Sequence, residues 1–314
     1  WALAEDAKAI QVSIAEARAI PPLVQLLGDG EERAHHHASG ALSSLGLDNR
    51  ENQIEITQLL IEPLSRGAPV AQERAATALW TLIRENASAH EAIAKAADPA
   101  ALVELLKAGI PSARDYAVWA LSLSIEGTEC QATIAEAGGV GPLIAQLSDK
   151  RPVIQQQAAE ALAKLAHDNR ETNTAITQAG GVEPLLALIR DVAPSKPPKE
   201  PANSTPTWSL ELAREASASA VHEKAVAALA SLASDPAARD EIVGAGGIAH
   251  LTWLLEAKEH GTKRFAATAL ARLSHEHEAT QSAIAASGAI KPLVALLDGS
   301  EGAEAQEAAA GAVL

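Results

Sequence analysis

The fold is decided by two stretches, AGGVGPL at residues 137–143 and QQQAAEALAKLA at residues 155–166. The second stretch spaces its alanines and leucines, among them Leu162 and Leu165, at the period of one face of an α-helix. In the first stretch, paired glycines supply the positive φ angle that a helix end needs before a sharp reversal, and a proline then starts the next helix. The two stretches therefore predict a unit of three helices, with the glycines between the first and the second.

The same unit recurs seven times along the chain. An isoleucine of the first helix precedes a leucine of the second helix by nine residues in six copies and by eight in one. These pairs are Ile14/Leu23, Ile56/Leu64, Ile93/Leu102, Ile134/Leu143, Ile176/Leu185, Ile242/Leu251 and Ile284/Leu293. A leucine of the third helix follows at Leu42, Leu79, Leu121, Leu162, Leu229 and Leu270, with Val313 in the same place near the end. The period of about 40 residues is typical of helical solenoids.

The motif Ala-Gly-Gly-Val-x-Pro-Leu at residues 137–143 and 179–185, followed by Ala-Ala-x-Ala-Leu-x-x-Leu-Ala at residues 158–166, resembles the armadillo repeat. The resemblance implies an all-α, right-handed superhelical solenoid of about seven armadillo repeats with three helices each, without a β-sheet. Residues 1–190 are expected to hold a partial first repeat and four more, and residues 218–314 the remaining repeats, the last one truncated. The sequence has no initial Met and opens inside an expected third helix, so we expect a larger chain or complex around it.

Residues 191–217 interrupt the repeat, because Leu229 follows Leu185 by 44 residues where the same interval is 19 in four other copies. Five prolines and few apolar side chains prevent this segment from continuing a helix or folding alone. We expect a mobile loop at one edge of the solenoid, followed by a short helix that starts near Trp208 and docks back. The spacing of the prolines at residues 194–197 also fits ligands of SH3-type domains, so a binding motif and a plain linker both stay open.

Composition limits the functional classes. The net charge of −15 argues against a nucleic-acid ligand, and it leaves both basic peptide partners and a plain soluble acidic surface open. Cys130 is the only cysteine, which excludes an internal disulfide and suits a reducing compartment. No apolar run approaches the roughly 18 residues that a membrane span needs. We therefore expect a cytoplasmic protein, with the nucleus or the cilium as alternatives.

The stretches that resemble cofactor-binding or metal-binding motifs lack the neighbouring structure or ligands that those motifs require. GAGGIA at residues 244–249 matches a dinucleotide-binding fingerprint, but an expected first helix precedes it where that motif needs a strand. Three consecutive histidines at residues 35–37 cannot all face one metal ion from a helix, and His275 and His277 lie beside no further ligand motif. The sequence therefore predicts no enzyme activity, no cofactor and no metal.

In armadillo proteins the third helices line a concave groove, and the resemblance implies that extended peptides or partner helices bind there. The nuclear-import receptors of the family carry a Trp before the Ala-Leu pair of the third helix and an Asn four residues later. The first place holds Trp only at Trp1 and Trp119 of this chain, and the second never holds Asn. These departures argue against recognition of nuclear-import signals.

The groove offers an aromatic cluster instead. Trp80, Tyr116 and Trp119 fall on two adjacent third helices in a chain with five Trp, one Tyr and one Phe. Aromatic side chains with an acidic rim favour a partner with apolar or basic side chains, whereas packing of Trp119 against the neighbouring third helix is the alternative. The predicted partner-binding groove comprises Trp80, Tyr116, Trp119, Thr77, Thr81, Asp115, Glu126, Gln156 and Glu160.

The sequence as a whole predicts a non-enzymatic scaffold or adaptor that binds a protein or peptide in the groove of the third helices. Two alternatives stay open. One is a nuclear transport receptor of importin-alpha type, and the other is the substrate-recruiting part of a larger, ubiquitin-ligase-like protein.

Overall fold

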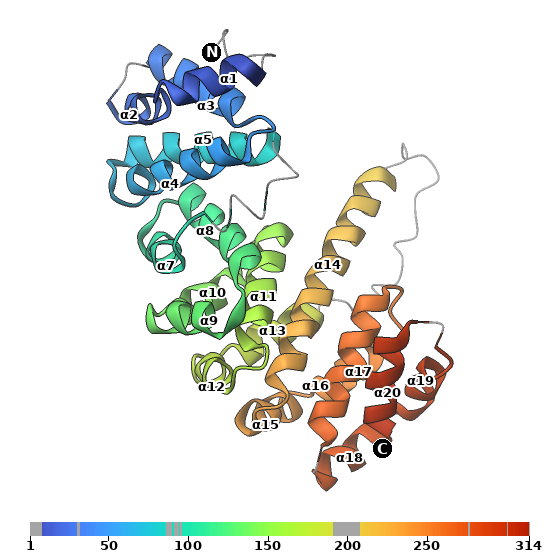
Figure 1. Cartoon of the computed structure of the whole chain (residues 1–314). Helices are drawn as coiled ribbons and strands as arrows, with labels where there is room; N and C mark the ends of the chain where they lie inside the picture. The colour runs from blue at the N-terminus through green and yellow to red at the C-terminus, as the bar shows by residue number, and fades with distance from the viewer. Residues whose placement is uncertain are drawn as a thin grey trace, which may run out of the picture. The chain divides into compact units, whose positions relative to one another are not determined.

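The computed structural model describes residues 8–29, 32–85, 90, 94, 96–190, 208–275, 277–299 and 301–313. All regular secondary structure in these ranges is helical (Figure 1). The chain divides into two compact units, Trp1–Pro142 and Leu143–Leu314, and each is described by itself. Within the described residues, no helix is both long enough and apolar enough to cross a membrane.

The first unit contains the helices α1 (Lys8–Glu16), α2 (Ile20–Asp29), α3 (Glu32–Gly46), α4 (Arg50–Arg66), α5 (Pro69–Glu85), α7 (Pro99–Ala108), α8 (Pro111–Ser124) and α9 (Gly127–Glu136). The helix α10 (Val140–Gln146) begins in the first unit. The second unit contains α11 (Pro152–Ala166), α12 (Arg170–Gln178), α13 (Val182–Arg190), α14 (Trp208–Leu232), α15 (Pro236–Gly244), α16 (Gly247–Leu254), α17 (His260–Ser274), α18 (Glu278–Ala286), α19 (Ile290–Leu296) and α20 (Ala303–Val313).

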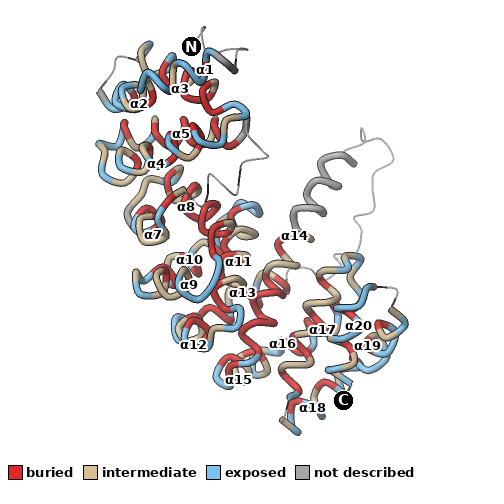
Figure 2. Tube along the Cα trace, viewed as in Figure 1, coloured by how far each residue is buried: buried red, intermediate tan, exposed pale blue. Residues whose placement is uncertain are grey.

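The third helices of successive repeats pack side by side within each unit. In the first unit α3 packs on α5 and α5 on α8, and in the second α11, α14, α17 and α20 follow one another in the same way (Figure 1). Their leucine anchors, such as Leu79 and Leu162, are fully buried, and buried stretches run along these helices (Figure 2). Val313, which the sequence placed at the anchor position of the last repeat, differs from these leucines because 47% of it is exposed. Ala309, one turn earlier, is fully buried. Stacking of third helices therefore forms the core of each unit.

The turn between first and second helices follows the expected glycine chemistry. Gly138 has φ +73°, and the matching Gly180, Gly246 and Gly288 also have positive φ. The next residue is restricted by space, because a Cβ on Gly139 would lie 2.8 Å from both Ile134 Cγ2 and Val103 Cγ2. The glycine pair thus turns the chain and seats the turn on α7 of the preceding repeat.

The second full repeat departs from the three-helix prediction. Its first and second helices are fused into α4, and no glycine lies between Arg50 and Arg66 to separate them. Ile56 and Leu64 are both buried on this one helix, where their spacing of eight residues is about 2.2 turns. The helix ends at Gly67, whose N–H donates to Pro63 O at 3.0 Å.

Polar side chains of a first helix often bond the carbonyl seven residues earlier, at the end of the preceding third helix. Asn52 Nδ2 donates to Leu45 O at 2.8 Å, and Gln281 Nε2 donates to Ser274 O at 3.0 Å. The hydroxyl of Thr172 donates to Leu165 O in the same way. These bonds satisfy carbonyls that a helix end leaves without an intrahelical partner.

Residues 191–207, which hold most of the predicted insertion, lie outside the described residues. Helix α14 begins at Trp208 as expected, but it runs for 25 residues to Leu232 and is itself the third helix of its repeat. Residues 208–217, which were assigned to the insertion with a short docking helix from about Trp208, are therefore part of one long helix. No Gly or Pro lies between Trp208 and Leu232 to end the helix earlier.

Candidate functional site

The predicted aromatic residues meet in the first unit, between the third helices α5 and α8. The ring of Trp80 on α5 lies 6.0 Å from the ring of Trp119 on α8, at 61°. Tyr116, one turn earlier on α8, lies 5.9 Å from Trp119 at 34°. Trp119 is therefore the centre of the cluster and joins the two helices.

His90 is a fourth member that the sequence did not reveal. Its ring lies 5.6 Å from the ring of Trp119 at 83°, and its Nε2 is 2.9 Å from Ile83 O. The distance of seven residues between His90 and Ile83 is the same as in the polar bonds of the other repeats. That recurring spacing of seven residues is the signal in the sequence that could have identified His90.

Burial corrects the predicted roles of the α8 aromatics. Tyr116 is fully buried and Trp119 is 7% exposed, whereas Trp80 is only half-buried. The expectation that Tyr116 faces an accessible groove is wrong, because apolar residues surround α8 and every residue from Tyr116 to Ser122 is buried. Burial also raises the pKa of the Tyr116 phenol well above its usual range. Trp80 is the least buried of the three predicted aromatic residues.

The exposed edge of the cluster runs along α5. Glu73 and Thr77 are exposed and Thr81 is half-buried. Thr77 Oγ1 donates to Glu73 O at 2.8 Å, and Thr81 Oγ1 donates to Thr77 O at 2.9 Å, so both hydroxyl protons are used within the helix. Glu73 Oε2 accepts a hydrogen bond of 2.9 Å from Ser112 Oγ on α8.

The other predicted acidic residues of the first unit do not form one rim. Asp115 is half-buried near the start of α8, and Glu126 is exposed just beyond its end. The helical part alone, nine residues from Asp115 to the end of α8 at Ser124, spans about 13 Å along the axis. Each is therefore a separate charge beside the cluster.

Gln156 and Glu160 belong to the second unit, where they lie one turn apart on α11. Both are half-buried. Glu160 Oε1 lies 3.5 Å from Lys224 Nζ on α14, so this carboxylate is engaged within its own unit.

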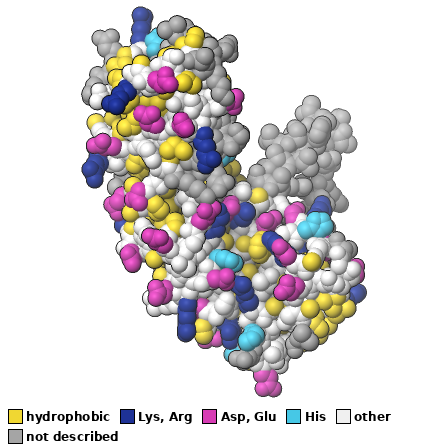
Figure 3. Space-filling model, viewed as in Figure 1, with side chains coloured by type: hydrophobic (Ala, Val, Ile, Leu, Met, Phe, Trp, Pro, Cys, Tyr) yellow, Lys and Arg dark blue, Asp and Glu magenta, His cyan; other side chains and the backbone are white. Residues whose placement is uncertain are grey.

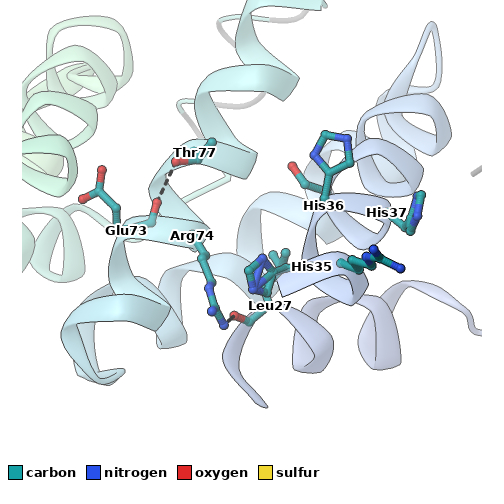
Figure 4. Close-up of a pocket in the computed structure, with 9 residues that line it drawn as sticks. Leu27, His35, His36, His37, Glu73, Arg74 and Thr77 are labelled. Atoms are coloured by element: carbon teal, nitrogen blue, oxygen red, sulfur yellow. Dashed lines mark hydrogen bonds between the residues drawn. The ribbon is translucent and has the colours of Figure 1, made fainter. Parts of the chain in front are cut away.

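A hollow of about 590 Å³ lies between α3 and α5 in the first unit (Figure 4). Its lining consists of Leu27, Arg33, His35, His36, His37, Ser39, Glu73, Arg74 and Thr77. The sequence favoured solvated or groove-facing imidazoles over a metal site for these histidines. The described residues contain no group of His, Cys, Asp and Glu that could hold a metal ion. The missed signal is register, because His37 and Arg74 each stand five residues before the leucine anchor of their third helix.

Elsewhere the described charges are interspersed. Figure 3 shows acidic and basic side chains mixed over the visible face. In the second unit Glu301 accepts from Lys263 Nζ at 2.5 Å and also contacts His260, and these bonds hold the pKa of Glu301 below its usual range. Burial raises the pKa of the Cys130 thiol, which is half-buried.

Comparison with known proteins gives the same type of repeat. Residues 127–167 match the Armadillo/beta-catenin-like repeat. The comparison with curated proteins gave no match. Among solved structures, an engineered protein from the Northeast Structural Genomics Consortium is 29% identical with a TM-score of 0.72, covering 99% of this chain and 71% of that one.

Two designed proteins share the fold. A designed armadillo repeat protein in complex with the peptide (KR)4 is 22% identical with a TM-score of 0.56, covering 94% of this chain and 98% of that one. A computationally designed armadillo repeat protein for modular peptide recognition is 21% identical, with the same TM-score and coverage. With the stacked helical repeats described above, these matches show that the chain has the all-α solenoid fold of armadillo repeats, and that residues 127–167 match one such repeat.

Proposed function

We propose that the chain is a non-enzymatic protein-interaction scaffold that binds an extended peptide or a partner helix along its third helices. The observation that supports this most is a stripe on α5, formed by Glu73, Thr77 and Trp80 at positions i, i+4 and i+7. Such residues share one face of a helix. Two designed proteins with this fold were made for, or crystallised with, peptides, which is consistent with the proposal.

Trp80 is the proposed anchor of this surface. Its ring is half-buried and packs on Trp119, which is in turn held by Tyr116 and His90. A ring fixed from behind loses little conformational freedom when a ligand covers its open side, which favours binding. Trp119 and Tyr116 are therefore supports, and the partner contacts Trp80.

The stripe also limits the sequence of the partner. Glu73 and Trp80 are seven residues apart, or about 10 Å along the helix axis. Three residues of an extended peptide cover about the same distance. A basic side chain opposite Glu73 and an apolar or basic one over Trp80 are then expected three positions apart, in line with the cation–π and burial preferences of Trp.

A peptide-library selection followed by titration tests the proposal. Peptides selected on the wild-type protein should bind Trp80→Ala at least about tenfold more weakly, which corresponds to 1.4 kcal/mol. The matched control is Trp253→Ala on α16, because this Trp is 39% exposed and lies on a second helix. Glu73→Gln should weaken only peptides that carry a basic residue.

Equal loss of affinity in the Trp80 and Trp253 variants would contradict the proposal, as would selected peptides that bind both as tightly as the wild type. Thermal unfolding of each variant checks that a loss of binding does not reflect a loss of folding.

A further inference from the structure

We propose that the hollow between α3 and α5 binds a phosphate group, carried by a phosphorylated serine or threonine of the bound peptide. This inference rests on the proposed function for the source of the phosphate. The hollow itself is an independent feature, and its affinity for inorganic phosphate can be measured without any peptide.

The lining is basic in a strongly acidic chain. It contains two arginines and three of the ten histidines of a protein with a net charge of −15. Among the described lining residues the only carboxylate belongs to Glu73, which accepts from Ser112 Oγ on α8. Figure 4 shows this carboxylate on the far side of Arg74 from the histidines. The described lining thus concentrates donors on one side and turns its acid toward a neighbouring helix.

One arginine of the lining, Arg74, is held in position by a hydrogen bond within the protein. Arg74 Nη1 donates to Leu27 O at 3.1 Å, and this bond draws the guanidinium from α5 toward the end of α2 (Figure 4). A guanidinium has five N–H donors in a planar fork, so the same group can hold the carbonyl and bond an oxyanion. Phosphate gains from such a fork, because charge-assisted bonds to it are stronger than neutral ones.

The donor set fits a phosphate better than a carboxylate. A phosphate monoester carries about −1.5 to −2 charges and three acceptor oxygens, whereas a carboxylate has one charge and two oxygens. The described lining offers two guanidinium groups, the hydroxyl of Ser39 and the histidines of α3, of which three in a row cannot all face one anion. A neutral imidazole still has one N–H donor, so the histidines contribute in either protonation state.

The hollow adjoins the proposed peptide surface. Thr77 lines the hollow and belongs to the stripe on α5, and Trp80 follows three residues later, about 4.5 Å along the axis. A phosphorylated residue in the hollow would therefore lie one or two residues from the peptide side chain that covers Trp80.

Calorimetric titration with inorganic phosphate tests the site first. Arg33→Gln and His36→Gln change exposed side chains and should each weaken binding, while Arg74→Gln should weaken it at least about tenfold. Glu73→Gln should strengthen binding, a change of sign that a purely structural role would not produce. Arg264→Gln on α17 is the matched control, because this arginine also lies on a third helix and is also held by a partner within its own unit, Glu304.

Peptides whose binding depends on Trp80 then test whether the phosphate is carried by a bound peptide. The phosphorylated form should bind more tightly than the unmodified form and than a form with glutamate in its place, and Arg74→Gln should remove that difference. A glutamate peptide that binds as tightly as the phosphorylated one would overturn the assignment to phosphate. Failure of the Trp80 test with intact phosphate binding would refute the proposed function and the peptide source, but leave the anion site standing.

The anion site is refuted by either of two results. One is the absence of saturable phosphate binding, which is expected if Asp29, Glu31 or Glu32, whose side chains lie outside the described part, neutralise the lining. The other is an equal loss of phosphate affinity in the Arg264→Gln control.

Discussion

Replacement of Gly139 by Ala tests how the turn of a repeat is seated on the repeat before it. The added Cβ would lie 2.8 Å from Val103 Cγ2 on α7 and 2.8 Å from Ile134 Cγ2 on α9. Carbon atoms in contact prefer about 3.5 to 4.0 Å, so each contact is too short by roughly 1 Å. Both neighbours are fully buried and β-branched, and neither can rotate away easily.

The cost should be about 1 to 3 kcal/mol, the usual range for overpacking a core. The matched control is Gly141→Ala, two residues later in α10, where an added Cβ meets nothing within 4 Å. There the loss of a flexible glycine should stabilise the protein by about 0.4 to 1 kcal/mol. The two single-methyl changes should therefore differ by about 1.5 to 4 kcal/mol.

Urea unfolding followed by circular dichroism measures the difference, with the slope of the transition checked for both variants. Repeat proteins can unfold in more than one step, so hydrogen exchange of α9 and α10 should accompany the measurement. If Gly139→Ala is as stable as Gly141→Ala, the close approach of this turn to α7 is not what requires a glycine here.

Three further predictions concern titratable groups. Tyr116→Phe should leave stability unchanged or raise it by up to about 1 kcal/mol, because among the described residues the buried hydroxyl has no hydrogen-bond partner. Thermal unfolding measures the difference. A large loss of stability would show that the hydroxyl is bonded. Glu301→Gln should destabilise the protein at neutral pH, because Lys263 and His260 lower the pKa of this carboxyl. That stabilisation is present above the ordinary value of 4.5 and disappears as the pH falls through the lowered pKa, so the variant and the wild type should converge in acid; a constant difference in unfolding midpoint would contradict it. Alkylation of Cys130 at neutral pH should be slower than that of a small thiol and should rise with pH, because burial raises the thiol pKa. Reaction as fast as the small thiol would refute this.

The sequence by itself determined the repeat, because its signals are local. The helical period of the Ala-rich stretches and the positive φ of Gly138 depend on residues close in the chain. That period also identifies the face on which anchors such as Leu162 are buried. The spacing of eight residues between Ile56 and Leu64 already marked the repeat in which two helices are fused in α4. The sequence did not show that the turn between the first and second helices is absent in this repeat, because a missing glycine permits fusion of the two helices without requiring it.

The approach of Trp80 and Trp119 also followed from register, since the two residues lie within one helical turn of equivalent positions on stacked third helices. Only the tertiary structure decided how much of each ring stays accessible. Tyr116 and Trp119 are buried because neighbouring helices cover α8. His90, which lies between α5 and α7 in the chain, also contacts the cluster. The hollow beside Arg74 likewise arises from the packing of α2, α3 and α5. Periodicity assigns a side chain to a helix face, but burial depends on every segment packed against that face.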